Sequence, residues 1–134
     1  MRAAVTVAGL LLSLQAFACG YCVEDKIAAT YDHAVITRAL ASGHHVVFFH
    51  VDGAPVSRAV LEQAASGRGI EKGSARISPD VLTLSVAFDP RRISLVELNA
   101  ALDRKLTKHK ASLLPLRVME RPADFAAVKR QPGV

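Results

Sequence analysis

The feature that most constrains the fold is the order in which strand-like and helical hydrophobic patterns follow one another between residues 44 and 119. Strands show apolar runs or strict alternation, and amphipathic helices repeat their apolar positions every three to four residues. In chain order the patterns indicate a strand at 44–51, a helix from 56 to the glycines at 67 and 69, strands at 72–78 and 81–88, a helix at 94–106 and a strand at 111–119. This order is the ferredoxin-like split βαβ arrangement, β-α-β-β-α-β, so we predict an α+β fold with an antiparallel sheet.

Local signals support several of these elements. Ser94 and Glu97, three residues apart, form the capping box that begins many helices. Residues 78–80, Ser-Pro-Asp, separate the two middle strands as the turn of a hairpin. Pro115 cannot donate a backbone hydrogen bond, so the last strand is predicted at an edge of the sheet.

A further helix is predicted before the sheet, over residues 23–41, and Gly43 ends it. Both faces of the first strand carry large apolar residues, whereas the two helices of a split βαβ unit cover only one face of its sheet. The N-terminal helix has an apolar stripe of its own (Ile27, Tyr31, Ala34, Val35 and Ala39). We therefore expect it to cover the second face.

The first 18 residues have the pattern of a cleavable secretory signal. Arg2 precedes an uncharged run over residues 3–14, and Ala16 and Ala18 match the small-x-small pattern that signal peptidase accepts. A membrane anchor needs about 20 consecutive apolar residues, and the charges at 24–26 follow too soon for that. We expect a periplasmic or secreted protein that starts at Cys19, carries no lipid and has no transmembrane segment in its mature chain.

The expected organisation is a signal peptide at 1–18, a Cys-x-x-Cys pair with the N-terminal helix at 19–43, a ferredoxin-like domain at 44–120 and a tail at 121–134. Residues 19–120 should form one folded unit. Removal of the signal leaves about 116 of the 134 residues, which is enough for one domain with a core.

Composition and motifs exclude several classes of function. The net charge of +5 is spread along the chain, and the chain has no Trp, two Tyr and five Phe, whereas a nucleic-acid-binding surface needs clustered basic residues and aromatic platforms. We expect no nucleic-acid partner. The sequence shows no catalytic motif of a hydrolase or transferase and no binding motif for an organic cofactor. We therefore predict a protein that is not an enzyme, with thiol-disulfide exchange as the one enzymatic alternative.

Four segments, at residues 46–53, 56–61, 86–90 and 95–98, resemble the heavy-metal-associated domain of copper chaperones and of metal-pumping ATPases. The resemblance covers about residues 46–119 and implies the ferredoxin-like fold. In that family two cysteines in the loop after the first strand bind a soft metal. Here that loop is residues 52–56 and contains no Cys, so the family's metal ligands cannot be transferred to it. A degenerate domain of this kind that binds no metal therefore stays an open alternative.

Cys19 and Cys22 are the two cysteines of the chain, and their Cys-Gly-Tyr-Cys spacing suits either a soft metal ion or a reversible disulfide. The start of a helix favours the thiolate form, because the helix dipole and the unpaired amides stabilise negative charge. The same motif resembles the active site of thioredoxin-fold disulfide isomerases, but the strand that precedes it in that fold is missing here. An inert disulfide between Cys19 and Cys22 is the third interpretation.

Two histidines are candidate further ligands. A helix of about 19 residues is roughly 28 Å long, and a strand of about seven residues is roughly 23 Å long. If the helix folds back along the first strand, Cys22 lies beside His50, and the loop that contains His109 reaches the same end of the sheet. We predict that Cys19, Cys22, His50 and His109 converge as a metal site. His44 and His45 are expected at the opposite end facing solvent, and His33 on the surface of the helix.

The favoured function is binding or delivery of a soft metal ion, most plausibly Cu(I), through Cys19 and Cys22. The alternatives are a periplasmic thiol-disulfide protein in which Cys19 attacks and Cys22 resolves, and a partner-binding module with an inert disulfide. The expected partners are the metal ion and another periplasmic metal or redox protein.

Overall fold

A four-stranded antiparallel sheet lies at the centre of the structure, a computed structural model that describes residues 22–122. The predicted signal peptide at 1–18, Cys19 and residues 123–134 of the tail lie outside the described residues. The elements are α1 (Val23–Thr30), α2 (His33–Ala41), β1 (His45–Gly53), α3 (Arg58–Ala64), β2 (Arg76–Ser78), β3 (Thr83–Phe88), α4 (Leu95–Leu106), the 3-10 turn η1 (Thr107–His109) and β4 (Ala111–Met119). The predicted α+β class with an antiparallel sheet is confirmed.

The sheet has the order β2-β3-β1-β4. β1 pairs on one side with β3, from His45 opposite Phe88 to His50 opposite Thr83. On its other side it pairs with β4, which forms an edge of the sheet. The register shifts between Phe48 and Phe49, where β4 contains Pro115. The predicted edge position is therefore confirmed. Proline has no backbone N–H to donate, so in a central strand it would leave a carbonyl of a neighbouring strand without its hydrogen bond.

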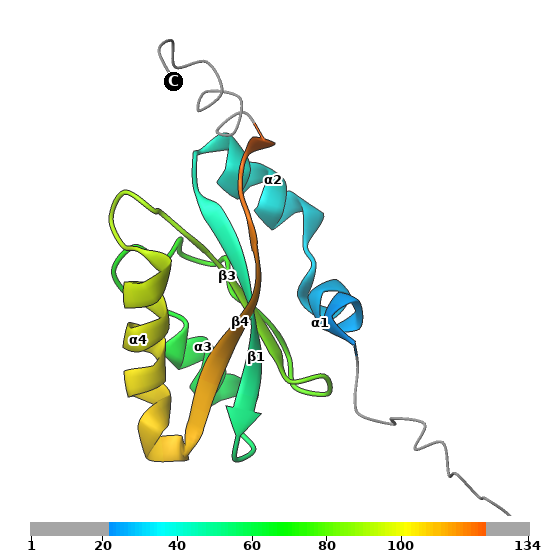
Figure 1. Ribbon diagram of the computed structural model, residues 1–134, viewed down its shortest axis with the longest axis vertical. Helices are drawn as coiled ribbons and strands as arrows, with labels where there is room; N and C mark the ends of the chain where they lie inside the picture. The colour runs from blue at the N-terminus through cyan, green and yellow to red at the C-terminus, as the bar shows by residue number, and fades with distance from the viewer. Residues whose placement is uncertain (1–21, 123–134) are drawn as a thin grey trace, which may run out of the picture.

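The helices α3 and α4 cover one face of the sheet (Figure 1). The side chains of Val47, Phe49 and Val51 point to this face and form the larger hydrophobic cluster with Leu61 of α3 and with one stripe of α4. That stripe consists of Leu98, Leu102 and Leu106, all buried. The predicted capping box of α4 is confirmed, since Ser94 accepts a hydrogen bond from the amide of Glu97 and the Glu97 carboxylate accepts one from the amide of Ser94.

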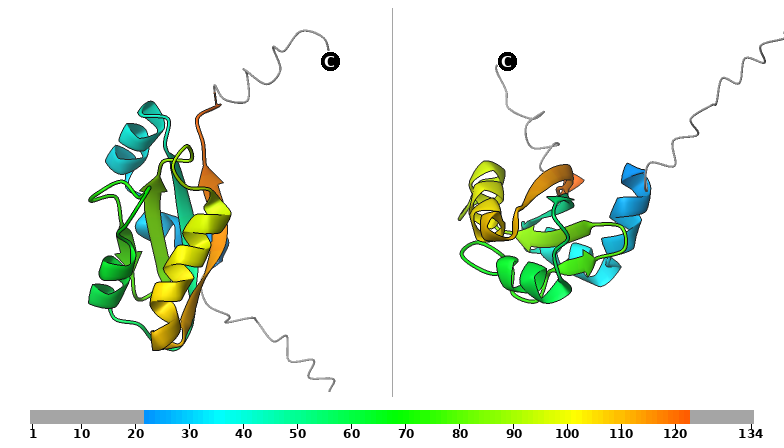
Figure 2. Two further views of the ribbon diagram at one scale, coloured as in Figure 1. Left: turned by 90° about the vertical axis from the view of Figure 1, so that its left-hand side faces the viewer. Right: turned by 90° about the horizontal axis from the view of Figure 1, so that it is seen from below.

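The helices α1 and α2 cover the opposite face (Figure 2). Ile27 of α1 and Ile36 and Ala39 of α2 form a second, smaller cluster with Val46 and Phe48 of β1 and with Ala87 of β3. The alternation of β1 explains the two clusters, because successive side chains of a strand point to opposite faces.

The prediction of one continuous helix over residues 23–41 is wrong. The chain leaves the helical conformation at Tyr31 and Asp32, and α2 starts anew with Asp32 as its N-cap, whose side chain accepts a hydrogen bond from the amide of Val35. Asp32 also forms an ion pair with Arg76, the first residue of β2, with 2.8 Å between Oδ2 and Nε. Tyr31, expected in the apolar stripe, is exposed. Aspartate is a strong N-cap residue. Because Asp32 caps α2, Tyr31 and Asp32 lie between the two helices and not within one.

The strand predicted at 72–78 is shorter in the structure, where β2 contains three residues. The preceding segment instead runs beside the end of β3, and Ile70 pairs with Phe88 in an isolated bridge. Within residues 22–122, none of the helices is long and apolar enough to cross a membrane.

Candidate functional site

Cys22 is the N-cap residue of α1, and its side chain is exposed. Its carbonyl accepts a hydrogen bond from the amide of Lys26 at 3.1 Å, which is the first bond of the helix. The sulfur does not cap the helix and donates instead to the carboxylate of Asp25, with 3.1 Å between Sγ and Oδ2. The thiol is therefore at the surface, at the point where the first turn leaves backbone amides unpaired.

The helix that carries Cys22 is held against the sheet by a buried residue and an ion pair. Ile27 is 4% exposed and packs in the smaller hydrophobic cluster. Glu24 forms a forked ion pair with the guanidinium of Arg117 on β4. The hydrogen bond from Arg117 lowers the pKa of the Glu24 carboxyl. These contacts fix the start of α1 relative to β4, so Cys22 has a defined position on the surface.

His50 lies on the same side of the sheet as α1. The Lys26 ammonium is 3.0 Å from Nδ1 of His50, and the imidazole is partly buried. A charged ammonium can only donate, so Nδ1 is the acceptor in this contact. This contact places the first turns of α1 beside the second half of β1. Lys26 is four residues, about one helical turn, after Cys22.

His109 lies on the other side of the sheet. It is in η1, directly after α4, and it lines a surface hollow together with Val60 and Ala64 of the α3 segment and with Lys108. The structure therefore does not bring His50 and His109 together. The prediction of convergence assumed one long helix and considered only the ends of the strands, not the faces of the sheet. Among residues 22–122, no group of three or more His, Cys, Asp or Glu side chains is close enough to hold a metal ion.

The remaining histidines differ partly from expectation. His33 is exposed on α2, as predicted. His44 and His45 were expected to face solvent, but their side chains are only 22% and 20% exposed. In His44, Nδ1 lies 3.6 Å from Oε2 of Glu71 and Nε2 lies 3.9 Å from Oδ2 of Asp89. The ring of His45 packs edge-on against Phe88. Carboxylates and an aromatic ring at this end of the sheet explain the partial burial.

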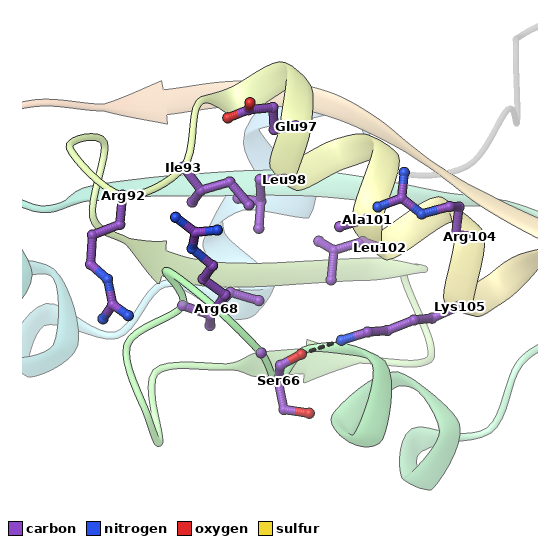
Figure 3. Close-up of a pocket in the computed structure, with 12 residues that line it drawn as sticks. Ser66, Arg68, Arg92, Ile93, Glu97, Leu98, Ala101, Leu102, Arg104 and Lys105 are labelled. Carbon is purple, nitrogen blue, oxygen red and sulfur yellow. Dashed lines mark hydrogen bonds between the residues drawn. The ribbon is translucent and has the colours of Figure 1, made fainter.

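A second candidate site lies on the α3 and α4 side of the sheet, and no sequence motif predicted it. The loop after α3 and the length of α4 enclose a hollow of about 540 Å³. Arg68, Arg92, Arg104 and Lys105 line it, together with the apolar side chains of Ile93 and Ala101 (Figure 3). These basic residues are far apart in the chain, so only the fold brings them together, and no spacing motif could have identified them.

Comparison with family models, with curated proteins and with solved structures gives no match for this chain.

Proposed function

We propose that this chain is an exported protein that binds a soft metal ion, with Cu(I) as the preferred ion, through Cys19 and Cys22. The observation that carries the proposal is the exposed thiol of Cys22 at the start of a helix that Ile27, Glu24 and Lys26 tie to the sheet. Cys19 precedes it by three residues, a spacing that allows both sulfurs to bind one ion.

The chemistry of the two sulfurs favours Cu(I). Thiolates are soft ligands and select Cu(I) or Zn(II) over hard cations such as Mg²⁺. Both thiols lose their protons on binding, and the hydrogen bond from Cys22 to Asp25 is then given up. His50 is the histidine that the fold puts on the side of α1, so it is the candidate third ligand, and binding through Nδ1 requires Lys26 to move away. His109 is not part of this proposal, because it lies on the opposite side of the sheet.

The fold is compatible with this proposal. We infer that this chain has a ferredoxin-like split βαβ fold with α1 and α2 added. The element order β1-α3-β2-β3-α4-β4 and the sheet order β2-β3-β1-β4 support this inference. The loop after β1 contains no cysteine, so the proposed metal site is on the added helix and not in the loop.

The same two sulfurs could instead exchange a disulfide with a partner protein. Exposure of Cys22 serves both chemistries, because attack on a disulfide also needs an accessible thiolate. The two functions differ in what the reduced protein does with copper and in how readily a disulfide between Cys19 and Cys22 is reduced.

The deciding experiment is a competition titration of Cu(I) against a chromophoric chelator, with the reduced protein. We expect one tightly bound equivalent, a loss of at least about a hundredfold in affinity for Cys22→Ser, and a smaller loss for His50→Ala. His109→Ala is the matched control, since it removes an imidazole from the other side of the sheet, and it should bind as the unaltered protein does.

Equal, weak copper uptake by the unaltered protein and by Cys22→Ser would exclude the metal function. A redox titration of the cysteine pair in glutathione buffers then separates the alternatives. A readily reduced disulfide indicates exchange chemistry, and one that resists glutathione indicates a structural disulfide.

A further inference from the structure

One wall of the hollow is the loop after α3, whose backbone at Gly69 lies close to the turn before α4. Gly69 has a φ of +81°, and a Cβ at this position would be 2.4 Å from Cγ2 of Ile93. The carbonyl of Gly69 accepts a hydrogen bond from the amide of Asp89 at 2.8 Å. The loop is thus fixed next to the turn that begins α4, and it forms a wall of the hollow.

Lys105, in the last turn of α4, bounds the hollow at its other end. Its ammonium donates to the carbonyl of Ala64 at 3.1 Å and to the carbonyl of Ser66, which links α4 to the end of α3 (Figure 3). Between these two attachments lie buried side chains of α4, with Leu98 1% exposed and Leu102 fully buried. These leucines support the hollow from below its surface, and the apolar surface open to a ligand comes from the partly buried Ile70, Ile93 and Ala101. The hollow therefore has an apolar floor and fixed ends.

The arginines of the described chain fall into two groups. Five of them form ion pairs with carboxylates, and they are Arg38, Arg58, Arg76, Arg91 and Arg117. Arg121 donates to two backbone carbonyls of α2. Arg68, Arg92 and Arg104 have no such partner within residues 22–122, and all three line the hollow. The arginines that form no ion pair with a carboxylate of residues 22–122 and no hydrogen bond to a described carbonyl thus all line this hollow, spread along its length (Figure 3).

One carboxylate, that of Glu97, lies among the described residues that line the hollow. It accepts a hydrogen bond from the amide of Ser94 at 2.9 Å and so belongs to the capping box of α4. This backbone hydrogen bond is the main reason that the pKa of Glu97 is lowered, and the charge of Arg68 contributes a smaller part. Glu97 therefore offsets one positive charge, while three arginines and Lys105 contribute four.

We propose that this hollow binds a small organic anion that has an apolar body and a carboxylate or phosphate group. A volume of about 540 Å³ is in the range of small-molecule sites. Guanidinium groups bind planar carboxylates and phosphates through paired hydrogen bonds. The partly buried Ile70, Ile93 and Ala101 offer apolar surface to a ring or chain. The site is on the opposite side of the sheet from Cys22, so this proposal does not depend on metal binding.

The test uses 1-naphthyl phosphate and 1-naphthoate as probes, with calorimetric titration of the folded protein. We expect one of the two to bind to a single site, and which of them binds more tightly identifies the anionic group. Inorganic phosphate and 1-naphthol, which each lack one half of the proposed ligand, should bind at least about tenfold more weakly. Arg68→Gln and Arg104→Gln should each weaken the better probe by about tenfold, the effect of one charge-assisted hydrogen bond.

Arg92→Gln and Arg91→Gln form the matched pair. They are neighbours in sequence and change the net charge equally, but Arg91 is paired with Asp89 and Arg92 lines the hollow. Weaker binding by Arg92→Gln together with unchanged binding by Arg91→Gln supports the site. Equal weakening by both variants would show general attraction to a basic protein and would overturn the proposal. The proposal would also be overturned if neither naphthyl probe binds, or if inorganic phosphate binds as tightly as 1-naphthyl phosphate.

Discussion

Gly69 shows how a single residue shapes the hollow on the α4 side. Its positive φ is unfavourable for any residue with a side chain, and the space that a Cβ would need is occupied by Ile93. We expect Gly69→Ala to lower the free energy of unfolding by about 2–4 kcal/mol, because backbone strain and steric overlap act together. Equilibrium unfolding in urea measures this loss.

Gly43 is the control for that prediction. Its φ of +77° is close to that of Gly69, but nothing lies within 4 Å of a Cβ placed on it. Gly43→Ala should therefore show the strain alone, about 1–2 kcal/mol. Equal losses in the two alanine variants would mean that Ile93 moves aside freely and that the wall of the hollow is not fixed.

Among the structural elements, α1 and α2 form a layer that depends on a small cluster of its own. Phe48 and Phe49 are adjacent, both fully buried, and point to opposite faces of the sheet. Phe48→Ala and Phe49→Ala should each cost about 3–5 kcal/mol. Their effects on local stability should differ, because Phe48 packs against α1 and α2 and Phe49 against α3 and α4.

Amide hydrogen exchange measures that difference. In Phe48→Ala we expect the amides of α1 and α2 to lose far more protection than those of α4, and in Phe49→Ala we expect protection to fall throughout. A uniform loss in Phe48→Ala would show that the N-terminal helices and the sheet open as one unit.

The sequence predicted the elements whose signals are local. The Ser94 and Glu97 capping box and Pro115 on the edge strand are examples, because each acts on backbone within a few residues. The break in the N-terminal helix was missed, since Asp32 within an apolar helical pattern is compatible with an exposed helical position. The residue that holds Asp32 in its capping place, Arg76, is 44 positions away in the chain.

The candidate site was predicted only in part for the same reason. Cys22 was predicted beside His50. The structure brings Lys26 of the same helix into contact with His50, and the approach of Cys19 and Cys22 to His50 stays a prediction. The opposite placement of His109 depends on which face of the sheet α4 covers, and helix periodicity alone does not determine this. The three unpaired arginines of the hollow come from different segments, so their meeting is a property of the tertiary fold.

At the scale of the whole molecule, ion pairs and caps connect segments that are distant in sequence. Glu24 on α1 bonds to Arg117 on β4, and Asp32 before α2 bonds to Arg76 at the start of β2. Both carboxylates join the N-terminal layer to the sheet. The N-terminal helices are therefore attached to the sheet by two ion pairs in addition to the smaller hydrophobic cluster.

These connections predict how stability depends on pH. The pKa of Glu24 is lowered by the hydrogen bond from Arg117, and the pKa of Asp32 is lowered by the amide of Val35 and then by Arg76. Carboxyl groups in the unfolded chain take up protons near pH 4, whereas these groups in the folded protein do so at lower pH. The folded state therefore binds fewer protons in this range, so its stability is complete above about pH 5 and is lost as the pH falls through the folded pKa values.

We expect the urea midpoint to fall steadily from about pH 5 to pH 3. Asp32→Asn should be less stable than the unaltered protein at pH 7 and should show a shallower fall, because one of the responsible groups no longer titrates. Asp80→Asn is the control, since Asp80 is exposed in the turn between β2 and β3 and forms no ion pair within the described residues; it should keep the full slope. A midpoint that stays constant or rises between pH 5 and pH 3 would contradict the stabilising role of these carboxylates, and an unchanged slope in Asp32→Asn would exclude Asp32 from it.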